Sequence, residues 1–398
     1  MTKEPVSDRS PLSVFLIFLR LGLTSFGGPI AHLGYFRDEF VERRKWLSEK
    51  NYADLVALCQ FLPGPASSQV GLAVGLSRAG YAGAFAAWAG FTLPSAIALI
   101  LFAIGVTSFA DSLSSGVLHG LKLVAVAVVA QAVWGMAKNL CTDVPRVTIM
   151  MAACCVVLMF PSALGQVLTI AGAAIIGMLI FNVDKKTDHS PLPLTVSHRA
   201  AGIFLLLFIA LLIGLPVAAQ AFGSQYMAMI DAFFRSGSLV FGGGHVVLPL
   251  LQAEVVPSGW VSNDAFLAGY GAAQAVPGPL FTFSAFLGAA SNTGSPLLTG
   301  FMCLLAIFVP SFLLVFAALP FWEKLRSNER MQAALAGINA AVVGLLLAAL
   351  FHPVWTSAVF KPQDFALALI AFVALMFWKL PPWLVVVGTG VIGGLVYL

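Results

Sequence analysis

The chain reads Gln60-Phe61-Leu62-Pro63-Gly64-Pro65 and, 214 residues later, Gln274-Ala275-Val276-Pro277-Gly278-Pro279. Each copy lies inside an apolar stretch of membrane-spanning length. Proline breaks the interior of a helix but is tolerated at its first position, where no amide hydrogen is needed. Each Pro-Gly-Pro therefore ends one helix and starts another. The two copies predict a duplicated helical protein whose helices are broken at membrane depth.

Four further motifs repeat in the same order along the chain. The copies are Phe26–Pro29 with Phe241–Gly244, Trp46 with Trp260, Pro94-Ser95 with Pro310-Ser311, and Gly120 with Gly337. The offset drifts only from 214 to 217, so chance does not explain the series. We divide the chain into an N-terminal repeat (1–182), a linker with one transmembrane helix (183–222) and a C-terminal repeat (223–398).

The composition excludes a soluble protein. Hydrophobic residues make up 60% of the 398 residues and charged residues only 10%, against about 25% charged in soluble domains. We expect an all-α polytopic membrane protein without a removable signal peptide. Its thirteen apolar segments lie near 11–27, 51–77, 80–108, 117–137, 147–160 and 162–181, near 200–219, and near 225–242, 263–291, 296–321, 333–351, 364–379 and 382–398.

The number of segments fixes how the two halves are related. Equivalent segments are separated by six segments and one linker, which is an odd number, so the second half should be inverted in the membrane. Lys3 and Arg9 place the N-terminus in the cytoplasm by the positive-inside rule. Simple alternation puts the basic loop 37–50 on the wrong side. The conflict disappears if the first two segments are re-entrant hairpins broken at Gly27-Gly28-Pro29 and Pro63-Gly64-Pro65.

The broken helices suit an anion. A half-helix that starts at membrane depth presents free amides and a positive dipole end there, and inverted symmetry brings the two copies toward one point. The candidate ligands are Gln60, Gly64, Pro65, Ser67 and Ser68, then Gln274, Gly278, Pro279 and Thr282, and the glycines Gly27, Gly28, Gly242 and Gly243. The alternative interpretation is that these residues are packing kinks and tight helix contacts.

Three cations at membrane depth are further candidates for anion binding. Arg20 and Arg235 are repeat equivalents, and arginine binds oxyanions with forked hydrogen bonds. The alternative is that each arginine pairs with an acid, such as Asp231 for Arg235. Lys122, whose counterpart is Asn339, binds the anion in one half only or is an interfacial lysine.

Five other side chains are candidates for carrying coupling protons: the repeat-matched Glu39 and Glu254, and the histidines His32, His119 and His245. The glutamates could equally lie in interfacial loops. The sequence shows no catalytic constellation, nucleotide-binding loop, metal-ligand spacing or nucleic-acid patch. We therefore expect no enzyme activity and no cofactor, with transport driven by an ion gradient or the membrane potential.

These motifs resemble the chromate ion transporter family, which carries Phe-Gly-Gly-Pro and Pro-Gly-Pro in each of two repeats. Here the second copy has Gly244 in place of the first proline. The resemblance implies a bacterial inner-membrane protein that expels chromate and gives chromate resistance, with sulfate as competitor; it could be a homodimer. The alternatives are transport of sulfate or another oxyanion, and a passive anion channel. The residues alone argue only for an anion.

Overall fold

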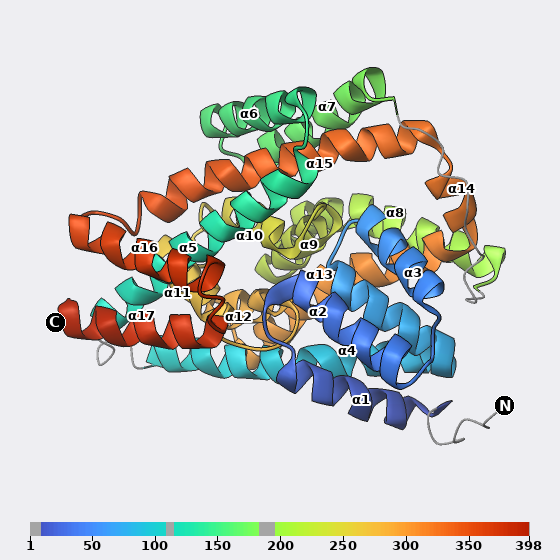
Figure 1. The fold of residues 1–398 in the computed structure, drawn as a ribbon, viewed down its shortest axis with the longest axis horizontal. Coiled ribbons are helices and arrows are strands. Elements are labelled where there is room, and N and C mark those ends of the chain that lie inside the picture. The colour runs from blue at the N-terminus through green and yellow to red at the C-terminus, as the bar shows by residue number, and fades with distance from the viewer. Residues whose placement is uncertain (1–8, 109–114, 183–195, 398) are drawn as a thin grey trace.

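A computed structural model describes residues 9–108, 115–182 and 196–397. The basic residues Lys3, Lys185 and Lys186, which bear on the predicted orientation, lie outside these ranges. The described residues form helices and no strand, as predicted (Figure 1). Six of these helices are long and apolar enough to cross a membrane.

The first half opens with a helix that turns back on itself. Helix α1 (Pro11–Thr24) runs to the Phe-Gly-Gly break, and α2 (Gly28–Arg37) returns along it and continues as a π-helical turn (Asp38–Arg43). Phe18 of α1 consequently meets Phe36 and Phe40, with ring centroids 5.5 and 5.1 Å apart. A second pair follows, in which α3 (Glu49–Phe61) runs to Pro-Gly-Pro and α4 (Ala66–Ser108) begins after it.

Helix α4 is two helices joined by a sharp turn. Ala79 and Gly80 have non-helical dihedral angles, and Gly80 has a φ of 63°. A Cβ on Gly75 would lie 2.3 Å from the carbonyl oxygen of Gly83, whereas eight residues of straight helix span about 12 Å. Residues 66–78 therefore fold back on residues 81–108. The predicted segment 51–77 corresponds to α3 together with residues 66–78 of α4. The predicted segment 80–108 corresponds to the rest of α4.

The second half repeats this order. Its elements are α9 (Gln225–Ser238), a 3₁₀ turn (Gly244–Val246), α10 (Val247–Val255), α11 (Asn263–Ala273), a 3₁₀ turn (Leu280–Thr282), α12 (Phe283–Ala290) and α13 (Pro296–Ala318). Between the halves runs α8 (His198–Phe222), an apolar helix with only Ala201 buried, as a lipid-facing helix requires. Helices α2 and α10 lie wholly outside the predicted apolar segments, because each is short and carries polar residues.

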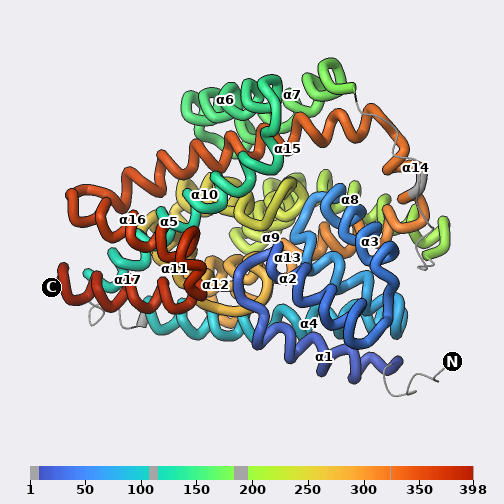
Figure 2. Tube along the Cα trace, viewed as in Figure 1, coloured from blue at the N-terminus to red at the C-terminus, as the bar shows by residue number. Residues whose placement is uncertain are grey.

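The remaining helices are exchanged between the halves. Helix α5 (Ser115–Leu140) packs on α16 (Pro362–Met376) and α17 (Pro382–Val396) of the second half. Helix α15 (Glu329–Ala349) packs on α6 (Val144–Met159) and α7 (Ala163–Ile180) of the first (Figure 2). The contacts use matched glycines, Gly120 against Gly393 and Gly337 against Gly177, where a Cβ would lie within 3.0 Å of the neighbouring Cα.

Three short elements remain among the described residues: a 3₁₀ turn (Leu319–Phe321), α14 (Trp322–Arg326) and a π turn (Leu350–Trp355).

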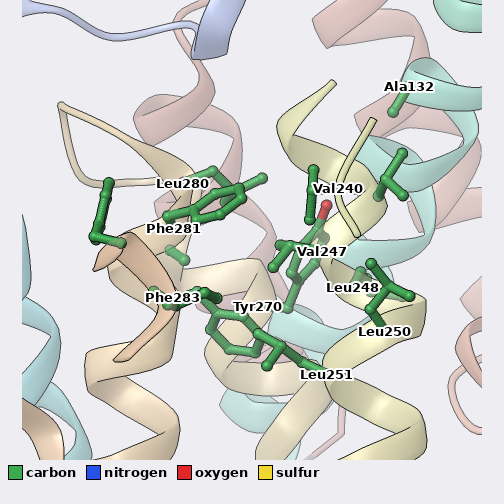
Figure 3. Packing of buried hydrophobic residues seen from close by; sticks show 14 of the residues in the cluster. Ala132, Val240, Val247, Leu248, Leu250, Leu251, Tyr270, Leu280, Phe281 and Phe283 are labelled. Atoms are coloured by element: carbon green, nitrogen blue, oxygen red, sulfur yellow. The ribbon is translucent and has the colours of Figure 1, made fainter. Parts of the chain in front are cut away.

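The helix lengths agree with the re-entrant arrangement. Helices α1 and α3 have 14 and 13 residues and so extend about 20 Å, less than the roughly 30 Å of a hydrocarbon core. Since α2 returns along α1, the basic loop 37–50 lies on the side where α1 begins. Apolar side chains pack around the breaks of the second half, including Val240, Val247 and Phe281 (Figure 3).

Candidate functional site

The breaks of the two halves are joined by a matched pair of hydrogen bonds. The Gly64 amide donates to the Val240 carbonyl (N···O 2.7 Å), and the Gly278 amide donates to the Ser25 carbonyl (2.9 Å). Each acceptor directly precedes the Phe-Gly-Gly motif of the other half. Each Pro-Gly-Pro break is therefore held against the Phe-Gly-Gly break of the opposite half, and the four breaks meet.

A repeated serine explains why both breaks need glycine. Gly64 and Gly278 have φ of +121° and +90°, values that favour glycine. A Cβ on Gly64 would lie 2.3 Å from Ser311 Oγ, and one on Gly278 would lie 2.7 Å from Ser95 Oγ. The Ser95 hydroxyl also donates to the Pro277 carbonyl. The serine of each Pro-Ser motif thus packs against the Pro-Gly-Pro break of the other half.

A cavity of about 240 Å³ opens beside two of these breaks, and we call it the central cavity. Four predicted site residues line it, namely Gly27, Gly28, Gln274 and Gly278. Because α2 begins at Gly28, its free N-terminal amides lie at this wall. Three more polar side chains join them, and these are Gln131, His245 and Lys379.

His245 is held by a buried tyrosine. Its Nδ1 lies 2.7 Å from the hydroxyl of Tyr270, which is fully buried. Its Nε2 faces Gly28, where a Cβ would lie 4.0 Å away. When the tyrosine hydroxyl donates to Nδ1, the ring proton is on Nε2 and can be donated to a bound anion. In the sequence, His245 was a candidate only for carrying coupling protons, although it follows the repeated glycines and its counterpart is Ile30.

Sequence reasoning missed Gln131 and Lys379 as cavity residues. Gln131 lies in the middle of α5, in an apolar run with only a weak polar signal. Lys379 lies in the turn between α16 and α17, and its φ of 52° is unusual for a residue with a side chain. The signal for Lys379 in the sequence was a cation between two apolar segments, which resembles an ordinary interfacial lysine.

The other copy of the glycine motif has different surroundings. A Cβ on Gly242 would lie 3.2 Å from Leu140 and 3.4 Å from Asn339 Oδ1, and one on Gly243 would lie 3.6 Å from Met136 Sδ. Neither glycine lines the central cavity. The two halves are therefore not equivalent here, although their motifs match in the sequence.

One predicted polar residue of the first Pro-Gly-Pro break, Ser67, contacts a histidine instead. Ser67 Oγ lies 3.4 Å from His32 Nδ1, and His32 Nε2 lies 3.2 Å from the Ser25 carbonyl oxygen. Ser68 is buried, and Gln60 is exposed. In the second break, the Thr282 hydroxyl donates to the Pro279 carbonyl (2.8 Å). None of Pro65, Ser67, Ser68, Gln60, Pro279 and Thr282 lines the central cavity.

The two predicted arginines form repeat-matched ion pairs. Arg20 lies 2.5 Å from Glu39, and Arg235 lies 2.8 Å from Glu254 and 2.9 Å from Asp231. Neither arginine lines the central cavity. Burial raises the pKa of the Glu39 carboxyl, but hydrogen bonds and charge from Arg44 and Arg20 outweigh it and leave that pKa below its usual range. The structure thus shows the ion pairing that was the alternative to anion binding.

The third predicted cation lies elsewhere. Lys122 lines a separate cavity of about 470 Å³ at the start of α5, where its ammonium is 3.0 Å from Asp264. Within the described ranges, no group of three histidines, cysteines or acids could hold a metal ion.

Known proteins share sequence similarity with both halves of this chain. A family model described as "Chromate transporter" matches residues 12–178 and 227–394, once in each half. The "Chromate transport protein" of Pseudomonas aeruginosa is 28% identical over 84% of this chain and 78% of its own length. That of Cupriavidus metallidurans is 24% identical over 96% and 92%. An "Uncharacterized transporter" of Methanocaldococcus jannaschii is 28% identical over 87% and 85%. No solved structure matches the chain.

Proposed function

We propose that this chain, which belongs to the chromate transporter family, exports chromate from the bacterial cytoplasm across the inner membrane and thereby gives chromate resistance. The observation that carries the proposal is the central cavity, where glycine breaks of both halves and uncharged donors come together. Relatives named as chromate transport proteins support the substrate. The N-terminus is cytoplasmic in this proposal, as Arg9 favours.

The chemistry of the cavity suits a tetrahedral dianion that must also leave. Gly28 contributes the amide end of α2, while Gln274 and His245 contribute side-chain donors. Such donors stabilise an anion without a fixed countercharge. Lys379, an exposed residue, adds the one positive charge among the residues that line this cavity. Its left-handed backbone holds the lysine there at a cost of about 1–2 kcal/mol.

The membrane potential favours export. A potential of 100 mV is worth about 2.3 kcal/mol per charge, so a dianion that leaves a negative interior gains about 4–5 kcal/mol. Uniport is therefore sufficient, and proton coupling is not required. Sulfate has the same shape and charge as chromate and should compete for the site. A channel is a weaker alternative, since matched broken helices are typical of transporters, whereas channels use rings of charge.

Inverted inner-membrane vesicles that contain the protein should accumulate chromate when the potential is imposed, and sulfate should inhibit the uptake. The expected result follows from the export direction, because inversion turns export into uptake. Tracer uptake with matched protein-free vesicles measures it. No accumulation by folded protein, under either a potential or a proton gradient, would overturn export of chromate.

Substitution of the uncharged donors tests the site itself. We expect Gln274→Ala and His245→Gln each to raise the KM for chromate about tenfold, because a hydrogen bond to a charged group is worth about 1.5–3 kcal/mol. Gln220→Ala, on an exposed position of α8, is the matched control. Unchanged KM in both cavity variants, measured at equal protein level, would remove this cavity from the transport path.

A further inference from the structure

A second cavity lies at the end of the molecule where α17 ends, opposite the end that holds α14 (Figure 1). It has a volume of about 470 Å³ and is lined by the starts of α5, α11 and α16, by Val106 of α4 and by Tyr397 after α17. Its charged and titratable lining residues are His119, Lys122, Asp264, Lys361, Asp364 and Tyr397. We call it the terminal cavity.

One of its two carboxylates is fully engaged. Asp364 has no exposed surface and accepts hydrogen bonds from His119 (2.9 Å), from Tyr397, and from the amides of Phe360 and Lys361 (2.8 Å each). These four donors fix the start of α16 to α5 and to the end of α17. Asp364 is therefore part of the wall, and its charge is already compensated within that wall.

The other carboxylate, that of Asp264, has a single ion pair among the residues that the structure describes, and most of its surface is exposed. Lys122 Nζ lies 3.0 Å from Asp264 Oδ1, and the Lys122 side chain is 11% exposed while that of Asp264 is 73% exposed. The carboxylate can thus rotate into water, but the ammonium stays in the cavity. The ion pair at the other end, Arg326 with Asp54, differs because both of its side chains are nearly buried, at 11% and 10%.

The terminal cavity lies on the same helices as the central cavity. Helices α5, α11 and α16 line both cavities. Asp264 at the start of α11 lines the terminal cavity, and Gln274 directly after its end lines the central one. Ten residues of helix span about 15 Å. Lys122 therefore lies on the side of α11 that is nearer to the end of the molecule, beyond the central cavity.

We infer that the terminal cavity is a second oxyanion site, in which a tetrahedral dianion displaces the Asp264 carboxylate from Lys122. This inference deepens the proposed function and rests on it for the identity of the transported ion. Asp264 acts as a tethered competitor: while it occupies Lys122 the site is closed, so the apparent affinity falls by the fraction of open molecules. The displaced carboxylate returns when the dianion leaves, and so favours release.

Sulfate binding to the purified full-length protein tests the inference by calorimetry. We expect Asp264→Asn to tighten sulfate binding about three- to fivefold and Lys122→Gln to weaken it about tenfold, with Lys122→Arg close to wild type. Lys138→Gln, an exposed position at the other end of α5, is the matched control for charge removal. If the ion pair is only structural, a different result is expected: Asp264→Asn and Lys122→Gln both lose stability, and neither variant binds sulfate more tightly than wild type.

The background Gln274→Ala/His245→Gln separates the two sites, because the central cavity should no longer contribute to sulfate binding there. If the Lys122-dependent binding persists in this background, the terminal site stands, even if the wild-type protein fails to carry chromate in vesicles. If Asp264→Asn binds sulfate no more tightly than wild type, or if Lys122→Gln binds it as well as wild type, the terminal site is overturned. The proposed transport of chromate would still stand in that case.

Discussion

Alanine at Gly64 or Gly278 should abolish transport, with a fall in rate of at least a hundredfold. On Gly64 the new Cβ would lie 2.3 Å from Ser311 Oγ and 2.8 Å from Gln69 Nε2. On Gly278 it would lie 2.7 Å from Ser95 Oγ and 3.0 Å from the Phe91 carbonyl oxygen. Left-handed backbone costs about 1–2 kcal/mol and overpacking about 1–3 kcal/mol more. Vesicle uptake and thermal unfolding of the purified variants measure the two effects.

The neighbours of the two glycines differ, and this gives the prediction a second arm. Ser311→Ala removes the nearest atom to Gly64 and leaves the Ser311 Cβ at 3.3 Å, so it should restore part of the transport of Gly64→Ala. Ser95→Ala should not rescue Gly278→Ala, because the backbone oxygen of Phe91 remains and the hydrogen bond to Pro277 is lost.

Gly135→Ala is the control for this prediction, since it lies within α5 and a Cβ there meets nothing within 4 Å. Alanine has the higher helix propensity, by about 1 kcal/mol, so this variant should be neutral or slightly stabilising. Normal unfolding temperature and normal uptake by both Gly64→Ala and Gly278→Ala would contradict the role of the contacts between each Pro-Gly-Pro break and the opposite half.

The repeated motifs were sufficient to predict the helix breaks and the duplication, because proline and glycine act on the backbone locally. Pro63–Pro65 and its copy end one helix and start another as predicted. The motifs do not encode which surfaces meet across the molecule. That Ser311 lies against Gly64, and that α5 packs on α16 and α17, depends on side chains from the opposite half.

The candidate site was harder to predict, since equal motifs have unequal neighbours. Gly27 and Gly28 line the central cavity, whereas Gly242 and Gly243 face side chains of α5 and α15. His245 was the one signal in the sequence that the two halves differ at the glycine motif. It is a polar residue at a position where the matching residue of the first half, Ile30, is apolar. Lys379 gave no such signal, as lysines in short turns between membrane segments are common.

The arginines Arg20 and Arg235 occupy equivalent positions, yet their substitution should have unequal effects. Glu39 lies within 3.0 Å of three arginines, Arg20, Arg43 and Arg44. In the other half, Glu254 and Asp231 share Arg235 alone among the ion pairs found in the described residues. Losing Arg20 leaves Glu39 paired, whereas losing Arg235 leaves two carboxylates with little exposure uncompensated.

We therefore expect Arg235→Gln to lower the free energy of unfolding by about 1–3 kcal/mol, after allowance for the partial exposure of the arginine, and to reduce transport with it. Arg20→Gln should change stability by less than about 1 kcal/mol. Thermal unfolding and vesicle uptake, measured on the same preparations, check both values.

Neutralising the acids separates a structural arginine from an anion ligand. Arg235→Gln combined with Asp231→Asn and Glu254→Gln removes the uncompensated charges, so stability and transport should both return toward wild type. An arginine that binds the transported anion gives a different result, because the triple variant would fold normally and still fail to transport. That outcome, together with an equal loss of transport in Arg20→Gln at normal stability, would show that the two guanidiniums bind the transported anion. The paired glutamates would then hold the arginine side chains in place between transport cycles.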